Sequence, residues 1–376
     1  MKKVKILIIS DTYEPHVDGV ARYISEIEKH YNFTVYTSYP RAKIRKKSVY
    51  TKSYFSVKIH GLEFSLPSFS TIRHLIGKCD VVFINSFGPS GIIGLLYAKI
   101  MNKPIIGFLH CYDPHLVVTA LNLPKFFEKI LKIPAKRLYY ACDSLLIENL
   151  LVVSYVKSHP KIVTTVFGVD KSRFMPANIT KKLLLRKRFN LPLNKILVLY
   201  SGRISHQKRI KAFCKIVDLV DKNLVEFFVV GDGPQRKILE DICKRHSNVH
   251  YYGSFMKRIE LAYQSCDIMI SLITDYSVNQ TFMEGCACGL PVVTFKAKVN
   301  VPFLFNRLNT IISDGTPESY AKSIEELAKN ENLRSKISYN AEKISYLRSW
   351  EKNAEIVVKL AKELIVEKLK SSIKVN

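Results

Sequence analysis

Residues 266–295 read CDIMISLITDYSVNQTFMEGCACGLPVVTF, and this segment is the most informative part of the chain. It consists, in order, of an apolar run, a polar loop, a helix-compatible stretch and a second apolar run, at 268–273, 274–280, 281–288 and 292–295. Gly289 and Pro291 end the helix-compatible stretch. Apolar runs on either side of a helix, separated by glycine and proline, predict a strand–loop–helix–strand unit of a parallel sheet.

The loop of such a unit lies at the carboxyl end of a parallel strand, where the first N–H groups of the next helix can hold an anionic ligand. Glu284 lies one turn inside the expected helix, between Met283 and Cys286. A carboxylate among apolar neighbours costs free energy unless a donor meets it, and ligand hydroxyls would serve. A structural carboxylate bonded to a nearby loop explains the residue equally well.

The length of 376 residues suits two domains of about 150–200 residues each. A hydrophobic content of 47% excludes a largely disordered chain. The net charge of +26 is spread over both halves and favours anionic partners: phosphorylated ligands, anionic lipid or nucleic acid. A generally Lys-rich composition without any special partner is the alternative.

The eight cysteines form no CxxC pair and have no metal-ligand spacing, which is typical of buried thiols in a reducing compartment. No run reaches the roughly 18 apolar residues of a membrane span. Asp11 ends the first apolar run too early for a signal peptide. We therefore expect a cytoplasmic protein, with peripheral membrane contact left open.

Apolar runs in the first half predict the strands of a first sheet, at 4–10, 33–37, 81–85, 104–110, 144–147 and 162–167. Gly19 precedes an amphipathic helix and would let the backbone approach a ligand closely, although most such glycines only turn the chain. His110 and Asp113 follow a run in the motif LHCYDP, where a parallel sheet presents side chains to a cleft. A purely structural histidine is the more common case.

Two segments of the first half carry clustered cations. Residues 41–58 contain seven Lys and Arg, no acid and several aromatics, and predict either a solvated basic loop or a surface that docks on anionic lipid. Residues 124–133 predict a short amphipathic helix that Pro134 ends or kinks, with lysines on one arc. Such a helix suits a membrane interface, and ordinary packing against a core explains the pattern at least as well.

The basic, proline-containing stretch that runs to Asn194 predicts an interdomain connection. Apolar runs at 196–200, 227–230 and 249–253 then alternate with helix-compatible stretches, so the second half predicts another α/β sheet. The motif SGRISHQK places Arg203 and Lys208 after a strand and Gly202, as a phosphate site needs. Neither GxxxxGK[ST] nor GxGxxG occurs, which argues against a kinase or a dehydrogenase.

Six motifs in order, DTYEPHVDGVARY, LHCYDP, FGVDKSRFMP, SGRISHQK, VVGDGP and MEGCACGLPVV, resemble those of retaining GT-B glycosyltransferases of family 4. The resemblance covers nearly the whole chain. The form of the first motif is most similar to that of members that glycosylate lipids, such as diacylglycerol glucosyltransferases and phosphatidylinositol mannosyltransferases.

This resemblance implies an α/β fold of two Rossmann-like, doubly wound parallel-sheet domains that face a cleft and hold a nucleotide-sugar donor, mostly through the second domain. The expected domains are 1–176 and 177–348, with a C-terminal helix, 349–376, that returns to the first domain. The implied activity is hexosyl transfer to a lipid or glycan acceptor, without a metal or another cofactor, by a cytoplasmic protein that can also lie peripherally on a membrane.

The resemblance also implies residue roles. Arg203 and Lys208 match the diphosphate-binding pair, Glu284 matches the residue that binds ribose hydroxyls, and His110 matches a histidine near the donor sugar. The other implied donor-binding residues are Asp18 and Gly19 in a loop over the phosphates, Gly202, Phe255 near the base, and Asn279, Gln280 and Thr281 at the phosphate and sugar. Asp113 and Tyr276 are assigned to the acceptor or the sugar.

One departure separates this chain from the family pattern. The first of the family's paired glutamates is replaced by Tyr276, with Asp275 beside it, and the usual loop glycine is replaced by Asn279. Two alternatives to a glycosyltransferase of lipids or glycans therefore remain. The charge suits nucleic acid, either as a binding partner or as the acceptor, and the missing acid suits an inactive GT-B scaffold.

Overall fold

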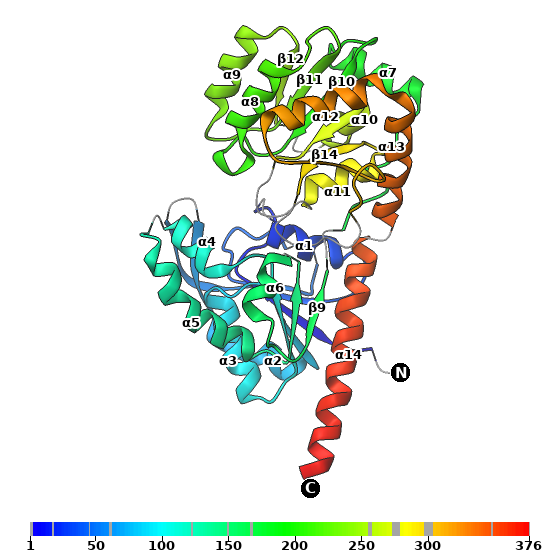
Figure 1. Ribbon diagram of the computed structural model, residues 1–376. Coiled ribbons are helices and arrows are strands. Elements are labelled where there is room, and N and C mark those ends of the chain that lie inside the picture. Colours follow the sequence, from blue (N-terminus) through cyan, green and yellow to red (C-terminus); the bar gives the residue numbers. More distant parts are fainter. Residues whose placement is uncertain are drawn as a thin grey trace. The chain divides into compact units, whose positions relative to one another are not determined.

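The computed structural model describes residues 3–16, 19–44, 46–59, 62–121, 123–148, 150–165, 168–254, 258–272, 279–296, 304–346 and 349–375. The chain divides into two compact units, each built around its own sheet (Figure 1). Unit 1 comprises Met1–Val166 and Trp350–Asn376, and unit 2 comprises Phe167–Ser349. The last helix therefore belongs to the first unit.

In the described part of unit 1, seven strands form a parallel sheet in the order β3-β2-β1-β6-β7-β8-β9. Their bounds are β1 (Ile6–Ser10), β2 (Thr34–Thr37), β3 (Val49–Thr51), β6 (Val81–Ile84), β7 (Ile105–Leu109), β8 (Ser144–Ile147) and β9 (Ile162–Thr164). The four central strands are buried along their whole length, as expected of apolar runs that are covered on both faces.

Helices cover both faces of this sheet (Figure 1). They are α1 (Gly19–Ile27), α2 (Phe69–Lys78), α3 (Pro89–Ile100), α4 (Asp113–Ala120), α5 (Phe126–Tyr140), α6 (Leu150–Val156) and α14 (Trp350–Val375). Side chains of α2, α3, α5 and α6 share one core with Leu7 and Ile9 of β1. On the other face, Tyr23 of α1 packs against Phe108 of β7 and Trp350 of α14.

The cationic segments of unit 1 differ from the predictions. Residues 41–58 are not a loop: they include β3 and β4 (Ser53–Ile59), and β4 pairs antiparallel with β5 (Leu62–Pro67). Alternating Val, Tyr, Thr and Phe residues, which favour strands, outweigh the lysines here. Pro134 does not end its helix either, because α5 continues to Tyr140 with the proline inside it.

In the described part of unit 2, six strands form a parallel sheet in the order β12-β11-β10-β13-β14-β15. Their bounds are β10 (Ile196–Ser201), β11 (Val225–Val230), β12 (Val249–Gly253), β13 (Ile268–Ile270), β14 (Val292–Phe295) and β15 (Ile311–Ser313). The helices are α7 (Ile179–Arg188), α8 (Ile210–Leu219), α9 (Arg236–Arg245), α10 (Glu260–Ser265), α11 (Gln280–Ala287), α12 (Pro317–Lys329) and α13 (Glu331–Tyr346).

Alternate residues of β10 enter two different cores. Leu197 and Leu199 pack with side chains of α10, α11 and α13, whereas Val198 and Tyr200 pack with side chains of α8, α9 and α12. Because successive side chains of a strand point to opposite faces, this division shows that helices cover both sides of the sheet. The unit predicted from residues 266–295 is confirmed as β13, α11 and β14.

The stretch expected to connect the domains belongs to unit 2. It contains α7, whose Arg186 is buried and bonds to Asp267 and to the carbonyls of Ser265, Leu193 and Lys195. The boundary of unit 2 also lies earlier than 176, because Val169 and Phe174 are part of its core. The basic run around Arg186 is therefore part of a packed helix, in which Leu185 and Arg186 are buried.

Candidate functional site

The loops at the carboxyl end of the second sheet are held together by their backbones. Gly202 and Gly231 have φ values of +139° and +147°, which favour glycine. A Cβ atom on Gly231 would lie 1.8 Å from the carbonyl oxygen of Gly202. The N–H of Gly202 donates to the Val230 carbonyl, and the N–H of Ile204 donates to the Asp232 carbonyl. The sequence GDGP thus provides the space into which the loop after β10 folds.

Lys208 lies at the end of a short 3-10 helix, His206–Lys208, directly above this loop. A Cβ atom on Gly202 would lie 3.9 Å from Lys208 Nζ, so the ammonium group stands over bare backbone. Burial lowers the pKa of Lys208 to about 8, and the Glu284 carboxylate opposes that shift. Arg203 is exposed. The loop therefore places one partly desolvated cation, and one solvated cation, at the sheet edge.

Asn279 caps the helix that starts beside this loop. Its side-chain oxygen accepts the N–H of Phe282 at 2.9 Å and the hydroxyl of Thr281 at 2.6 Å. The residue has an extended backbone, so asparagine can replace the family's glycine and act as the N-cap of α11. The N–H groups of Gln280 and Thr281 precede that of Phe282, in the first turn, where a helix provides no intrahelical acceptor. These two groups suit an anion.

Glu284 is buried, with 3% of its surface exposed. The Tyr263 hydroxyl donates to its Oε2 at 2.9 Å, and Gln280 Nε2 donates to its Oε1 at 3.2 Å. The same tyrosine oxygen lies 3.1 Å from the Ser201 hydroxyl at the end of β10. Tyr263 is fully buried, and burial raises its pKa well above the usual value, so it is neutral and donates. The carboxylate therefore has protein donors on both oxygens.

A row of polar side chains ends four neighbouring strands of the first sheet: Ser10, Asn85, His110 and Glu148, at β1, β6, β7 and β8. Asn85 Nδ2 lies 3.3 Å from Ser10 Oγ and its Oδ1 lies 3.2 Å from His110 Nε2. His110 Nδ1 lies 3.2 Å from Glu148 Oε2. The register pairs Leu109 with Ile147, which brings the two following residues side by side.

Asp113, predicted near the acceptor, begins α4 and accepts the Tyr139 hydroxyl at 2.7 Å. Burial raises its pKa to about 6, although Tyr139 and His110 act in the opposite direction. Asp11 follows β1 and accepts the N–H of Ser90 and the hydroxyl of Ser86. Burial also raises the pKa of Asp11. The carboxyl edge of the first sheet thus carries two partly buried acids, Asp11 and Asp113, beside the buried Glu148.

The structure brings Gly202, Lys208, Asn279, Gln280 and Glu284 together at one sheet edge, with Arg203 and Thr281 beside them. His110 and Asp113 lie at the edge of the other sheet, and Gly19 begins α1. The remaining predicted site residues, Asp18, Phe255, Asp275 and Tyr276, lie outside the described residues.

Sequence reasoning missed Ser201, Tyr263, Asn85 and Glu148. Three of them follow or end a buried apolar run, in ILVLYS, VVFIN and SLLIE, as His110 does in IIGFLH. A single polar residue at the carboxyl end of each run was the available signal. Tyr263 gives no such signal, because it lies within α10 and reaches Glu284 only through tertiary packing.

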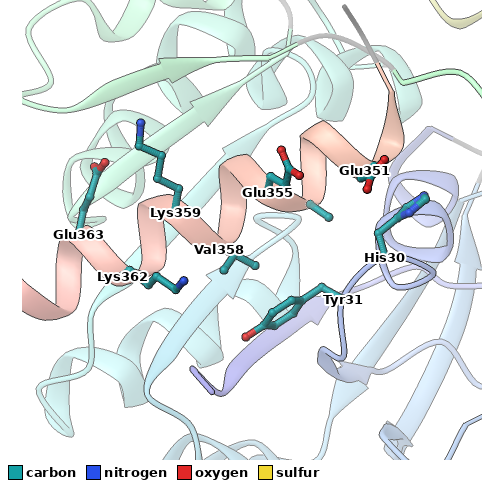
Figure 2. Close-up of a pocket in the computed structure, with 9 residues that line it drawn as sticks. His30, Tyr31, Glu351, Glu355, Val358, Lys359, Lys362 and Glu363 are labelled. Carbon is teal, nitrogen blue, oxygen red and sulfur yellow. The ribbon is translucent and has the colours of Figure 1, made fainter. Parts of the chain in front are cut away.

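A groove of about 470 Å³ in unit 1 has a different character. It runs along α14 beside His30 and Tyr31, and Figure 2 shows Glu351, Glu355 and Glu363 along the helix that also carries Lys359 and Lys362. Acids and bases alternate there, so the groove does not favour a diphosphate.

In the part of the chain that the structure describes, no helix is long and apolar enough to cross a membrane. No group of three or more His, Cys, Asp or Glu side chains in that part has the arrangement of a metal site.

Comparison with known proteins identifies relatives. Residues 181–344 match the family described as "Glycosyl transferases group 1". The chain is 24% identical over 312 residues to a GDP-mannose-dependent alpha-mannosyltransferase of Mycobacterium tuberculosis. This match spans 77% of this chain and 78% of the relative. It is also 24% identical over 342 residues to an alpha-monoglucosyldiacylglycerol synthase of Streptococcus pneumoniae, which covers 83% and 74% of the two chains.

Solved structures resemble the whole chain. The crystal structure of Anabaena Alr3699/HepE in complex with UDP has a TM-score of 0.75 at 16% identity and covers 98% of this chain and 100% of that one. Sucrose-phosphate synthase from Thermosynechococcus elongatus has a TM-score of 0.75 at 15% identity, with coverage of 97% and 100%. Likeness at these identities concerns the fold, and it confirms the predicted class of two Rossmann-like units in the GT-B architecture.

Proposed function

We propose that this chain, whose residues 181–344 form a glycosyl transferases group 1 domain, transfers a hexose from a nucleotide-sugar donor to a lipid or glycan acceptor. We further propose that the transfer retains the anomeric configuration and needs no metal. One observation carries the proposal: the partly desolvated Lys208 and the open start of α11 meet at one sheet edge over bare glycine backbone.

The diphosphate of the donor would lie between these groups. Lys208 and Arg203 provide positive charge, and the first N–H groups of α11 provide oriented donors. When the bond to the sugar breaks, negative charge grows on the leaving diphosphate, and preorganised donors stabilise that charge more than the ground state. The cations and the N–H groups would stabilise the charge of the diphosphate, as a divalent ion does in metal-dependent enzymes. In retaining transfer by front-side attack, the protein mainly orients donor and acceptor.

Glu284 can serve both of the roles that its sequence context suggested. An ionised carboxylate has about four lone-pair sites, and Tyr263 and Gln280 account for two of them. Gln280 Oε1 is buried and has no hydrogen-bond partner among the described residues. A ribose hydroxyl beside α11 would give this oxygen a donor, and Glu284 lies one turn further along the same helix. We therefore assign Glu284 and Gln280 to the ribose.

Donor binding tests the proposal. The M. tuberculosis relative is named for GDP-mannose, and HepE was solved with UDP, so the first probes are UDP, GDP, UDP-glucose and GDP-mannose. A ligand that binds only the native state at 100 times its Kd stabilises it by about 2.7 kcal/mol, which a thermal-shift assay detects. We expect a rise with one diphosphate and its sugar, and a smaller rise in Glu284→Gln.

A matched variant separates specific binding from general attraction to a basic protein. Lys208→Ala should abolish the rise, whereas Lys215→Ala on the exposed side of α8 should keep it. No rise with any of the four compounds, together with no sugar transfer, would favour an inactive scaffold. An equal rise in wild type and Lys208→Ala would contradict the assigned phosphate site.

We also propose that unit 1 contacts an anionic membrane, where a lipid acceptor would lie. Support comes from α5, on which Phe126, Ile130 and Ile133 are 56%, 55% and 63% exposed and thus do not pack on the core. Lys129 and Lys132 flank them. Each lysine near an anionic surface contributes on the order of 1 kcal/mol, and the attraction should weaken with salt.

Vesicle sedimentation tests this contact. Wild type should sediment with phosphatidylserine-containing vesicles more than with neutral vesicles, and Ile130→Asp combined with Lys129→Glu should remove the difference. Ile179→Asp is the matched control, because Ile179 is 69% exposed on α7 of unit 2. Equal sedimentation with both kinds of vesicle would remove the membrane from the proposal and leave a glycan acceptor.

A further inference from the structure

The buried carboxyl group of Glu148 stands next to His110, and neither the family resemblance nor the sequence assigns it a role. Its side chain is only 4% exposed, and that of His110 is 11% exposed. The imidazole lies between Glu148 Oε2 and Asn85 Oδ1, with 3.2 Å to each. The ring of Phe108 lies 3.9 Å from it, centre to centre. The orientation of His110 is therefore set on three sides by the first unit.

The hydrogen-bond network determines where the protons of this row lie. Asn85 Nδ2 donates to the Val20 carbonyl and lies near Ser10 Oγ, so Asn85 Oδ1 faces His110. An amide oxygen only accepts, and His110 Nε2 must therefore carry a hydrogen. A second proton is needed between His110 Nδ1 and Glu148 Oε2, on one atom or the other. Both ring nitrogens are thus used inside the protein, and the ring acts as a fixed element.

Holding His110 with Glu148 lowers the stability of the folded state. Its Oε1 is buried and has no hydrogen-bond partner among the described residues, and the same is true of the Tyr23 hydroxyl. Burial raises the pKa of Glu148, while His110 lowers it. The Glu148 charge in turn adds to the burial that raises the pKa of Tyr23. A buried polar atom without a partner lowers the stability of the folded state, so stability alone does not account for an acid here.

We propose that Glu148 is a positioning residue: by meeting His110 Nδ1 it keeps the imidazole oriented, with a hydrogen on Nε2, for sugar transfer at the carboxyl edge of the first sheet. The inference rests on the proposed function, and the placement of His110 near the donor sugar is what the family resemblance implies. Carboxylates commonly fix the tautomer of functional histidines through the second ring nitrogen. What is new here is the assignment of this task to the residue that ends β8.

Two substitutions separate positioning from stability. In Glu148→Gln the amide N–H can donate to His110 Nδ1, so turnover should stay within about threefold of wild type. In Glu148→Leu nothing meets Nδ1, the ring can turn or change tautomer, and kcat should fall by about tenfold to a hundredfold, since small misplacements have such effects. The melting temperature of Glu148→Leu should equal or exceed that of wild type, because the unpartnered oxygen is gone.

Glu226 provides the matched control in unit 2. It is also a buried glutamate bonded to a histidine, at 2.7 Å from His250 Nε2, but its other oxygen accepts from Lys195 at 2.7 Å. It lies near the amino end of β11, away from the carboxyl edge. Glu226→Leu should therefore lower the melting temperature and leave kcat unchanged, which is the opposite pattern.

A spectroscopic measurement decides the matter without turnover. Long-range ¹H–¹⁵N spectra of His-labelled protein, with the His110 signals assigned from their loss in His110→Gln, should show a hydrogen on Nε2 in wild type and Glu148→Gln, and a changed pattern in Glu148→Leu. The expected kinetics use whichever of UDP-glucose or GDP-mannose the wild type turns over.

Unchanged His110 signals in Glu148→Leu would overturn the proposal, and so would a loss of kcat that merely follows a lower melting temperature. If the wild type transfers neither sugar, the proposed function fails, while the ring signals still show whether Glu148 holds His110.

Discussion

The carboxyl edges of the two sheets are built from different kinds of groups. The edge of unit 2 is built from backbone: Gly202 and Gly231 bring two loops into contact, and α11 ends the arrangement with open N–H groups. The edge of unit 1 is built from side chains that bond to one another, from Asn85 through His110 to Glu148. A helix start whose first N–H groups have no acceptor within the helix suits an incoming anion, whereas a closed row of side chains suits a fixed geometry.

Burial acts on a lysine at the edge of unit 2, which also holds the buried Glu284, and on acids at the edge of unit 1. Burial lowers the pKa of Lys208 in unit 2, and burial raises the pKa of Asp113 and Glu148 in unit 1. In each case desolvation works against the charged form. Unit 2 is therefore ready to gain from an anion that pairs with its cation. In unit 1, burial works against the ionised forms of Asp113 and Glu148.

The largest effect should come from the cations of unit 2. Arg203→Ala and Lys208→Ala should each lower turnover, because each substitution removes about 3–4 kcal/mol of transition-state stabilisation. This is the typical loss when one preorganised donor to developing charge is removed. Steady-state kinetics with the donor found in the thermal-shift screen measures the loss, and circular dichroism checks the fold. Lys215→Ala is the control. Near wild-type turnover in both variants would show that the two edges do not differ as described.

The backbone contact between the loops can be broken by one methyl group. Gly231→Ala should lower the free energy of unfolding by several kcal/mol, because its Cβ would collide with the Gly202 carbonyl in addition to the strained φ. Gly253→Ala isolates the strain: its φ is +80°, and among the described residues beyond its chain neighbours no atom lies within 4 Å of the added Cβ. It should cost about 1 kcal/mol. Urea unfolding compares them, and equal costs would mean that the loops need no close contact.

A smaller effect is expected at the acidic edge of unit 1. The folded state raises the pKa of Asp113 from 3.8 to about 6, so the native state binds the proton more tightly than the unfolded state. The free-energy cost of ionising Asp113 in the folded state is absent below pH 4, grows as the pH rises and is complete above pH 6. Asp113→Asn should therefore raise the melting temperature by a few degrees at pH 7.5 and hardly at pH 4. A rise of equal size at both pH values would contradict the buried-acid account.

The strands were the predictable part of the fold. Apolar runs at 144–147 and 292–295 coincide with β8 and β14, because a strand buried on both faces needs a continuous apolar sequence. The basic runs misled the prediction, since α7 and the β4–β5 pair depend on partners elsewhere in the chain, such as Asp267 for Arg186 and Leu66 for Phe55. Charge alone does not reveal such partners.

The site was predictable where one loop or one helix contains the group, as for Gly202, Lys208 and Glu284. It was not predictable where strands distant in sequence assemble it: Asn85, His110 and Glu148 meet only because β6, β7 and β8 are neighbours in the sheet. The pattern of single polar residues after apolar runs was visible, but which of them meet depends on strand order.

The pH dependence of UDP binding tests the central claim most directly, or that of GDP if the screen selects it. Because the pKa of Lys208 is about 8 without ligand and a diphosphate binds only its protonated form, affinity should halve by about pH 8 and fall about tenfold from pH 7 to pH 9. Lys208→Arg keeps its charge over this range and should show no such fall. Calorimetry at pH 7, 8 and 9 measures both. A wild-type affinity that does not change with pH, or one that falls equally in Lys208→Arg, would contradict the assignment of Lys208 to the diphosphate.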